Sequence, residues 1–266
     1  MSMAPTQSSV ETPSHSFYRE ALDLLARSGI PFLIGGAFAF VHQTGIDKST
    51  KDLDIFVRPA DIMRVLEVCR RAGFEADLVF SHWLAKIHSP AGFIDVIFSS
   101  GNGIAAVDDG WFEHARPADL LGLQVKIAPV EETLWSKAFV MERERFDGAD
   151  VAHIIQSHGG SLDWRRLIDR FGKHWRVLFA HLVLFGFIYP SQRSRVPTWV
   201  MEELARRVAA EIAAGDAADP VCNGTLLSWS QYLGDVLGGE FRDGRIRPYG
   251  NMTAQEVARW TAADKS

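Results

Sequence analysis

The segment from Phe32 to Pro59 restricts the fold of this chain most, because it sets two aspartates one residue apart inside an apolar stretch, "KDLDIFV". Residues i and i+2 of a β-strand point to the same face, so Asp52 and Asp54 project together while Leu53 points to the other face. A carboxylate in a core strand is costly unless something binds it. The pattern therefore predicts a half-buried strand whose second face presents a pair of carboxylates to a divalent metal ion.

The elements around this strand predict an α/β arrangement. Gly35 and Gly36 separate a short apolar strand, "PFLI", from a helix that begins with "AFAF". A helix after Pro59 is followed by three β-type runs, "EADLVF", "HWLAKIHS" and "GFIDVIFSS", and a "PAG" turn joins the last two. The next stretch, "GNGIAAVDDGWFEHARPADLLG", predicts a loop-rich region that ends this part of the chain near Leu123.

The rest of the chain is almost wholly helical in pattern. Apolar residues at helical spacing predict helices at 130–143, 148–157, 163–171, 174–187 and 198–214. We therefore expect an α/β (α+β) fold, in which a small mixed sheet with flanking helices precedes a helical C-terminal half. The expected division is a disordered tail at 1–15, a core at 16–125 and a helical domain at 126–266, with a ligand cleft between the last two.

Composition favours a globular protein of the cytoplasm. The chain of 266 residues is 47% hydrophobic and 23% charged, and its net charge of −5 leaves only a local patch for nucleic acid. Cys69 and Cys222 stand far apart without zinc or disulfide spacing, which suits a reducing compartment. The N-terminus lacks the features of a signal peptide, and the most apolar window, Trp175–Pro190, is shorter than the ~20 residues that span a bilayer. Neither GxxxxGK[ST] nor GxSxG occurs, which argues against a P-loop NTPase and a serine hydrolase.

A third acid, Asp95, lies inside the apolar run "GFIDVIF". If its strand neighbours "KDLDIFV", three carboxylates converge, as a two-metal phosphoryl-transfer site requires. Mg²⁺ is a hard cation that binds one or two carboxylates together with substrate phosphates. Gly35 and Gly36 permit close approach of the backbone and leave N–H groups at a helix N-terminus for a phosphate, beside which Lys51 adds a positive charge.

The order of these motifs, "IGGAFAFVHQTG", then "STKDLDIFV", then "FIDVIF", resembles the nucleotidyltransferase superfamily built on the DNA polymerase β-type catalytic core. Within it, the chain is most similar to the bacterial group of AbiEii-type toxin nucleotidyltransferases and related proteins, in which a helical region with a lysine and then an aspartate follows the core. The matching segment here is "ETLWSKAFVMERERFDGADVAHII", with Lys137 followed by Asp147 and Asp150.

The resemblance implies a role for each acid and glycine of the core. Asp52 and Asp54 become metal ligands, and Asp95 becomes a third ligand or the base that activates the acceptor. Gly35 and Gly36 line the triphosphate. The implied cofactor is a pair of Mg²⁺ ions, with Mn²⁺ as a substitute.

The resemblance also assigns the lysine of the helical half to a phosphate. Asp147 or Asp150 then supports Lys137 or faces the active site. Asp147 also stands where a helix is expected to begin, so a plain N-cap is the alternative reading for it.

The implied activity is transfer of a nucleoside monophosphate from an NTP to a hydroxyl acceptor, with release of pyrophosphate. The acceptor is a tRNA or other RNA end, a protein side chain or a small molecule. A catalytically inactive nucleotide-binding module, acting as a sensor or partner protein, is the alternative from another class. A metal-dependent phosphohydrolase is a third reading.

Several other residues carry weaker expectations. His82 and Lys86 are candidate substrate contacts beside Asp95, and the loop at 99–112 is either a lid over the nucleotide or an ordinary loop. Residues 142–145 alternate in charge and predict a salt-bridged helix end. Four arginines of the helical half predict a solvated helix face, with contacts to phosphates as the alternative, namely Arg165, Arg166, Arg170 and Arg176.

Overall fold

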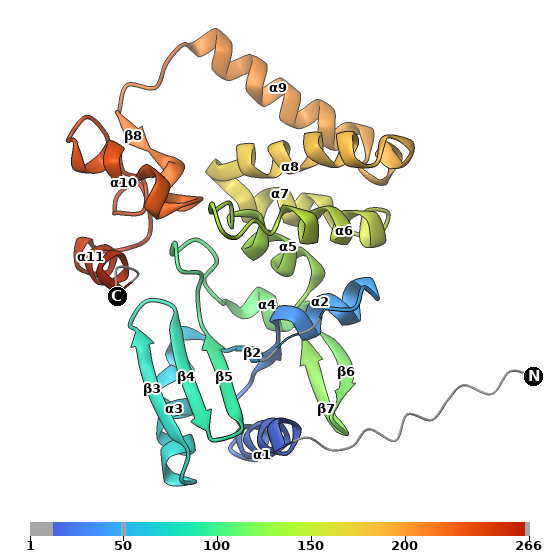
Figure 1. Cartoon of the computed structure of the whole chain (residues 1–266). Coiled ribbons are helices and arrows are strands. Elements are labelled where there is room, and N and C mark those ends of the chain that lie inside the picture. Colours follow the sequence, from blue (N-terminus) through green and yellow to red (C-terminus); the bar gives the residue numbers. More distant parts are fainter. Residues whose placement is uncertain (1–12, 49, 51, 264–266) are drawn as a thin grey trace, which may run out of the picture.

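The computed structural model describes residues 13–48, 50 and 52–263 of the chain. It is a mixed α/β structure in which a sheet-containing layer lies against a layer of helices (Figure 1). Both the mixed sheet and the helical half agree with the predicted fold class. Within the described residues, no helix is both long and apolar enough to cross a membrane.

Seven strands form the main sheet, and two of its neighbouring pairs are parallel. The order across the sheet is β3-β4-β5-β2-β1-β7-β6, with β2 parallel to β5 and β1 parallel to β7. A separate pair, β8 and β9, lies near the C-terminus. The strands are β1 (Leu33–Ile34), β2 (Leu53–Phe56), β3 (Glu75–Phe80), β4 (Leu84–Ser89), β5 (Gly92–Ile97), β6 (Arg116–Leu120), β7 (Leu123–Ile127), β8 (Val221–Cys222) and β9 (Arg242–Asp243).

Helices precede, interrupt and follow the sheet strands. The α-helices are α1 (Pro13–Arg27), α2 (Gly36–Thr44), α3 (Ile62–Arg71), α4 (Asp109–Glu113), α5 (Val130–Ala138), α6 (Gly148–His158), α7 (Trp164–Phe171), α8 (Trp175–Ile188), α9 (Thr198–Ala214), α10 (Trp229–Leu237) and α11 (Ala254–Ala263). Short 3₁₀ turns are η1 (Pro59–Asp61), η2 (Gly172–His174), η3 (Pro190–Arg195) and η4 (Asn223–Leu226).

The two faces of the sheet belong to two different cores. Leu53 and Ile55 of β2, together with Ile94 and Val96 of β5, are fully buried in a core shared with α1 and α3. The alternate residues point to the opposite face, where Phe56 joins a second core built mainly by α5 to α9. Strict alternation thus turns one face of β2 toward α1 and α3 and the other toward the helical layer.

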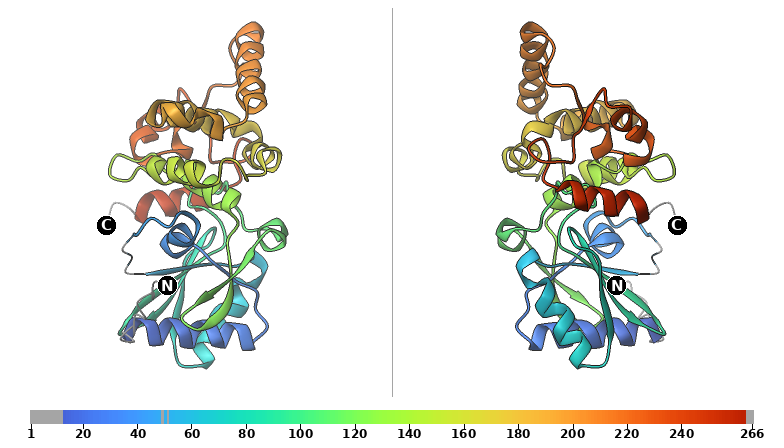
Figure 2. Two further views of the ribbon diagram at one scale, coloured as in Figure 1. Left: turned by 90° about the vertical axis from the view of Figure 1, so that its right-hand side faces the viewer. Right: turned by 90° about the vertical axis from the view of Figure 1, so that its left-hand side faces the viewer.

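The C-terminal segment returns to the sheet after the helical layer. Residues beyond α9 run back past the helices, and α11 lies at the level between the sheet and the helical layer (Figures 1 and 2). Trp260 of α11 packs edge-on against Phe80 and Trp83, with ring centroids 4.8 and 5.2 Å away. Helix α11 therefore covers one end of the sheet.

Three predicted boundaries were wrong. The stretch predicted as loop-rich, 101–122, contains α4 and β6, and the sheet continues through β7 to Ile127. β6 was not predicted because it contains Pro117 and Asp119, which are typical of turns. It is an edge strand, where a proline is tolerated. At the N-terminus α1 begins at Pro13, so the last residues of the predicted tail are helical.

The third wrong boundary is the end of α5. This helix stops at Ala138 instead of Arg143, and a ring nitrogen of the buried His181 lies 2.8 Å from the Ala138 carbonyl oxygen. The chain then turns back on itself, with a β-bridge between Met141 and Phe146. Residues 142–145 are therefore the tip of a turn and not a helix end.

Candidate functional site

Two of the predicted acids face each other across adjacent strands. In the parallel pairing of β2 with β5, Asp54 is the register partner of Asp95. Register partners on neighbouring strands point to the same face, ~4.8 Å apart. The alternation that buries Leu53 and Ile55 below the sheet therefore sends both carboxylates to the face that meets the helical layer.

Gly35 and Gly36 bring the start of α2 against the first of these acids. The Gly35 N–H donates to the backbone carbonyl of Asp54 at 2.9 Å. A Cβ on Gly36 would lie 1.6 Å from Oδ2 of Asp54, and one on Gly35 would lie 2.2 Å from the Phe56 ring. Only glycine fits at either position, and the N-terminus of α2 therefore lies directly beside Asp54.

Burial and neighbouring negative charge make Asp54 the most perturbed acid of the site. Desolvation, then repulsion from Asp95 and Asp52, raises its pKa to about 6, although Lys137 and Arg145 act in the opposite direction. Burial also raises the pKa of Asp95, against the opposing effect of its partner Lys86. Perturbed carboxylates of this kind cluster at functional sites.

Asp52 precedes the strand and is held by its own loop. Its Oδ1 accepts a hydrogen bond of 2.8 Å from the hydroxyl of Thr50, and Lys51, predicted to sit beside the phosphates, lies outside the described residues. Across residues 13–48, 50 and 52–263 no three His, Cys, Asp or Glu side chains are grouped closely enough to hold a metal ion. Asp54 and Asp95 thus lie side by side on two central strands, with Asp52 just before β2, but the three acids do not form a three-carboxylate cluster.

Lys137 lies where an ammonium group is enclosed by acids. Its Nζ is 2.6 Å from Asp150 and 3.0 Å from Asp147, and its side chain is 13% exposed. Lys48, after α2, bonds to the same Asp150 oxygen at 2.7 Å. Asp147 stands at the N-cap of α6 but makes no capping hydrogen bond, so the N-cap alternative is wrong and its carboxylate supports Lys137.

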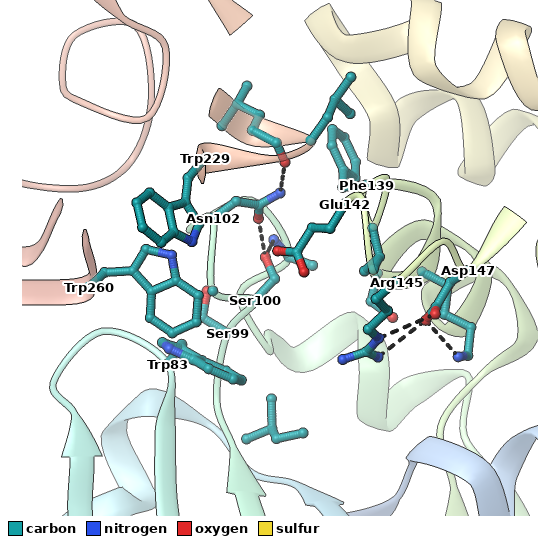
Figure 3. A pocket seen from close by; sticks show the side chains of 18 of the residues that line it. Trp83, Ser99, Ser100, Asn102, Phe139, Glu142, Arg145, Asp147, Trp229 and Trp260 are labelled. Atoms are coloured by element: carbon teal, nitrogen blue, oxygen red, sulfur yellow. Dashed lines mark hydrogen bonds and ion pairs between the residues drawn. The ribbon is translucent and has the colours of Figure 1, made fainter. Parts of the chain in front are cut away.

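Arg145 is the charged residue that the sequence prediction misplaced. It lies in the turn after α5, where its guanidinium donates to Asp147 at 3.3 Å. Both Arg145 and Asp147 border the same cavity as Asp54 (Figure 3). The one sequence feature that indicates this turn is Gly148. The Phe146 ring packs against it, in the space that a Cβ at position 148 would occupy.

A cavity of about 350 Å³ joins these groups. Gly36, Asp54 and Lys137 are among the residues that line it. Arg145 and Asp147 lie on one side of it, and Trp83, Trp229 and Trp260 lie on the other side (Figure 3). The cavity lies between the sheet and the helical layer, and the C-terminal segment, in which no individual site residue was predicted, forms one of its walls.

The loop after β5 lines this cavity and is tied to the C-terminal segment. Asn102 donates to the Leu226 carbonyl at 2.7 Å, and the Ser100 hydroxyl donates to Asn102 at 2.6 Å (Figure 3). The side chain of Asn251 donates to the Gly103 carbonyl at 2.9 Å. These bonds fasten the loop that the sequence suggested as a lid.

The remaining candidates fall into three groups. Lys86 pairs with Asp95 at 2.7 Å, and His82 contacts the Gly101 carbonyl and the Trp260 ring near the cavity. Arg166 and Arg170 are wrongly predicted as a solvated face. Each is 17% exposed and paired with the buried Glu132, because α7 packs on α5. The remaining two arginines lie at the surface of the helical layer, Arg165 over Trp199 and Arg176 beside Glu211.

Comparisons with known proteins found structural similarity only. No protein-family model and no curated protein sequence matches the chain. Antibiotic-resistance factor ANT(2'')-Ia superposes with 14% identity over 64% of this chain and 94% of its own, at a TM-score of 0.44. The lincosamide antibiotic adenylyltransferase LnuA gives 15% identity, 54% and 96% coverage and a TM-score of 0.38, and JHP933 from Helicobacter pylori gives 10%, 77% and 99% with 0.36.

Proposed function

We propose that this chain is a metal-dependent nucleotidyltransferase, which moves a nucleoside monophosphate from an NTP to a hydroxyl acceptor and releases pyrophosphate. The observation that carries the proposal is the pairing of Asp54 with Asp95 in register, directly beside the glycine-opened N-terminus of α2. Lys137 and Arg145 border the same cavity and supply positive charge for phosphates. Carboxylates, unpaired helix N–H groups and basic side chains around one cavity suit phosphoryl transfer.

The donor set fits a hard divalent cation. Asp52 and Asp54 offer only carboxylate oxygens, and because Gly36 has no Cβ, the Asp54 carboxylate fits against the N-terminus of α2. Burial, and then repulsion from Asp95 and Asp52, raise the pKa of Asp54 to about 6, and a bound cation would relieve this repulsion. Asp52 and Asp54 would hold Mg²⁺, which would supply charge neutralisation at the phosphates and a lower pKa for the attacking hydroxyl.

The chain's own residues then have separate tasks. The first N–H groups of α2 and the cations Lys137 and Arg145 bind the triphosphate. Asp95 orients the acceptor hydroxyl and takes its proton as the acceptor oxygen bonds to the α-phosphorus and the bond to pyrophosphate breaks. The tryptophan end of the cavity excludes water, which favours transfer over hydrolysis.

Thermal unfolding with each NTP tests the proposal, with and without Mg²⁺. A ligand at ~100 times its Kd adds ~2.7 kcal/mol, which raises the Tm of a chain of this size by about 5–10 °C. We expect this rise for at least one NTP, only with Mg²⁺, and its loss in Asp54→Asn. Asp169→Asn, at an exposed position of α7, is the control that keeps it.

The outcomes separate the candidate functions. A magnesium-dependent rise with pyrophosphate release in the presence of acceptor mixtures supports the transferase. Binding without any turnover supports the inactive module, and release of phosphate from NTP alone supports a hydrolase. No rise with any NTP contradicts nucleotide binding at this site.

A further inference from the structure

Lys86 continues the row of the two acids across the sheet. It is the register partner of Asp95 on β4, and Asp77 on β3 is in turn the partner of Lys86. The row therefore reads Asp77, Lys86, Asp95, Asp54 over four adjacent strands. Register partners share a face, so the ammonium group and both site carboxylates point to the same side of the sheet.

The position of the Lys86 ammonium is fixed by two neighbours. Its Nζ lies 2.7 Å from Oδ1 of Asp95 and 3.9 Å from the ring centroid of Phe93. The side chains of Lys86 and Asp95 are only 25% and 17% exposed, so solvent screens the pair little. The carboxylate of Asp95 and the face of the Phe93 ring therefore hold the Lys86 ammonium in a fixed position.

The second acid of the row has a different environment. Asp54 has the glycine-opened N-terminus of α2 at its side, and the cations that act on it, Lys137 and Arg145, belong to α5 and the turn after it. Its repulsion from Asp95 and Asp52 therefore remains, whereas the charge of Asp95 is matched at contact distance. This difference between Asp54 and Asp95 agrees with the finding that no three carboxylates among the described residues are grouped closely enough to hold a metal ion.

We propose that Lys86 is a built-in cation for Asp95, so that the chain holds one divalent ion, at Asp52 and Asp54, and not the two that the sequence motifs imply. The ammonium fills the coordination that Asp95 would offer a second ion. Asp95 remains a carboxylate that orients the acceptor hydroxyl. This inference rests on the proposed function for the first ion and revises only the number of ions and the role of Lys86.

Counting bound Mn²⁺ on the full chain without nucleotide tests the inference, by electron paramagnetic resonance of the free ion. We expect one Mn²⁺ per wild-type chain and two in Lys86→Met, which keeps the length of the side chain and removes its charge. Lys86→Arg should keep one. Lys126→Met removes an equal charge from β7, in the other half of the sheet, and should also keep one.

A second measurement asks whether Asp95 is a ligand in the wild type. We expect Asp95→Asn to change the Mn²⁺ dissociation constant by less than about threefold and Asp54→Asn to raise it by tenfold or more, since a tenfold change corresponds to about 1.4 kcal/mol. If Lys86→Met is unfolded by circular dichroism, this pair of variants decides the question alone. Repeating both titrations with a non-hydrolysable NTP shows whether nucleotide changes the count.

The possible failures are distinct. Two ions per wild-type chain, one ion in folded Lys86→Met, or a tenfold loss of affinity in Asp95→Asn overturns the inference and leaves the proposed transferase standing. A rise in affinity without a second ion also overturns it, because Lys86 then acts only through long-range charge. No bound Mn²⁺ with or without nucleotide contradicts the proposed function itself.

Discussion

The Cβ atom that Gly36 lacks would lie 1.6 Å from Oδ2 of Asp54. Gly36 also has a φ of +54°, a conformation that side-chain-bearing residues rarely adopt. We therefore expect Gly36→Ala to displace the Asp54 carboxylate and to abolish the Mg-NTP rise in Tm.

Gly45 is the matched control for this substitution. It has a φ of +70° at the end of α2, and a Cβ there meets nothing within 4 Å. Both alanine variants carry the same kind of backbone strain, about 1–2 kcal/mol, which urea unfolding measures. Only Gly36→Ala should lose nucleotide binding, and equal retention by both variants would mean that Asp54 does not need this space.

The raised pKa of Asp54 predicts how stability changes with pH. Because the pKa rises from 3.8 in the unfolded chain to about 6 in the fold, the folded state binds more protons between these values. The contribution of this group is fully present below about pH 4 and is lost as pH rises through 6. The lost contribution is at most ~3 kcal/mol.

Asp54→Asn removes this dependence. Denaturant unfolding in the absence of metal should give a variant that is more stable than wild type at pH 7.5, with the difference shrinking toward pH 4. The metal-bound wild type should lose the effect as well, because a cation offsets the repulsion from Asp95 and Asp52. A constant difference between the two proteins over this pH range would contradict the assignment.

Lys137 and Lys48 share Asp150 but should respond differently to loss of charge. Lys137 is 13% exposed and contacts two acids, whereas Lys48 is 42% exposed and contacts one. Removing one partner of a buried pair leaves an uncompensated charge at a cost of about 3–5 kcal/mol, while a surface pair contributes about 0–1 kcal/mol. Urea unfolding should therefore show a large loss for Lys137→Met and a small loss for Lys48→Met.

The sequence predicted the elements around the acids well because their signals are local. Alternation in "KDLDIFV" and "GFIDVIF" set which residues face the core, and the paired glycines located the start of α2. The sequence predicted that Asp54 and Asp95 converge only if their strands are neighbours, because a sequence pattern does not show which strands pair. β6 was missed because its proline and aspartate are typical of turns and are tolerated at an edge.

Residues whose role depends on a distant partner were harder to predict. Arg145 reads as part of a charged helix until the end of α5 at Ala138 turns it toward Asp147. Lys86 reads as a substrate contact until the β4–β5 register sets it against Asp95. No local sequence pattern indicates that Trp260 lines the cavity. Its segment reaches the cavity only after the chain has passed through the helical layer.

Trp260 is expected to hold the C-terminal segment on the sheet. Its ring packs edge-on against Phe80 and Trp83, and a Cβ on Gly101 would lie 2.9 Å from it. Loss of a large aromatic contact costs about 3–5 kcal/mol when fully buried, so the half-buried Trp260→Ala should lose about 2 kcal/mol in urea unfolding. Trp199→Ala, on α9 and 39% exposed, is the control and should lose less.

Trp260→Ala should also separate nucleotide binding from transfer to the acceptor. Trp260 lies on the side of the cavity away from Arg145 and Asp147, so Trp260→Ala should keep the Mg-NTP rise in Tm (Figure 3). Opening this wall admits water, and the ratio of NTP hydrolysis to transfer should increase. Loss of the Mg-NTP rise in folded Trp260→Ala would instead place the nucleotide, and not the acceptor, against the tryptophan wall.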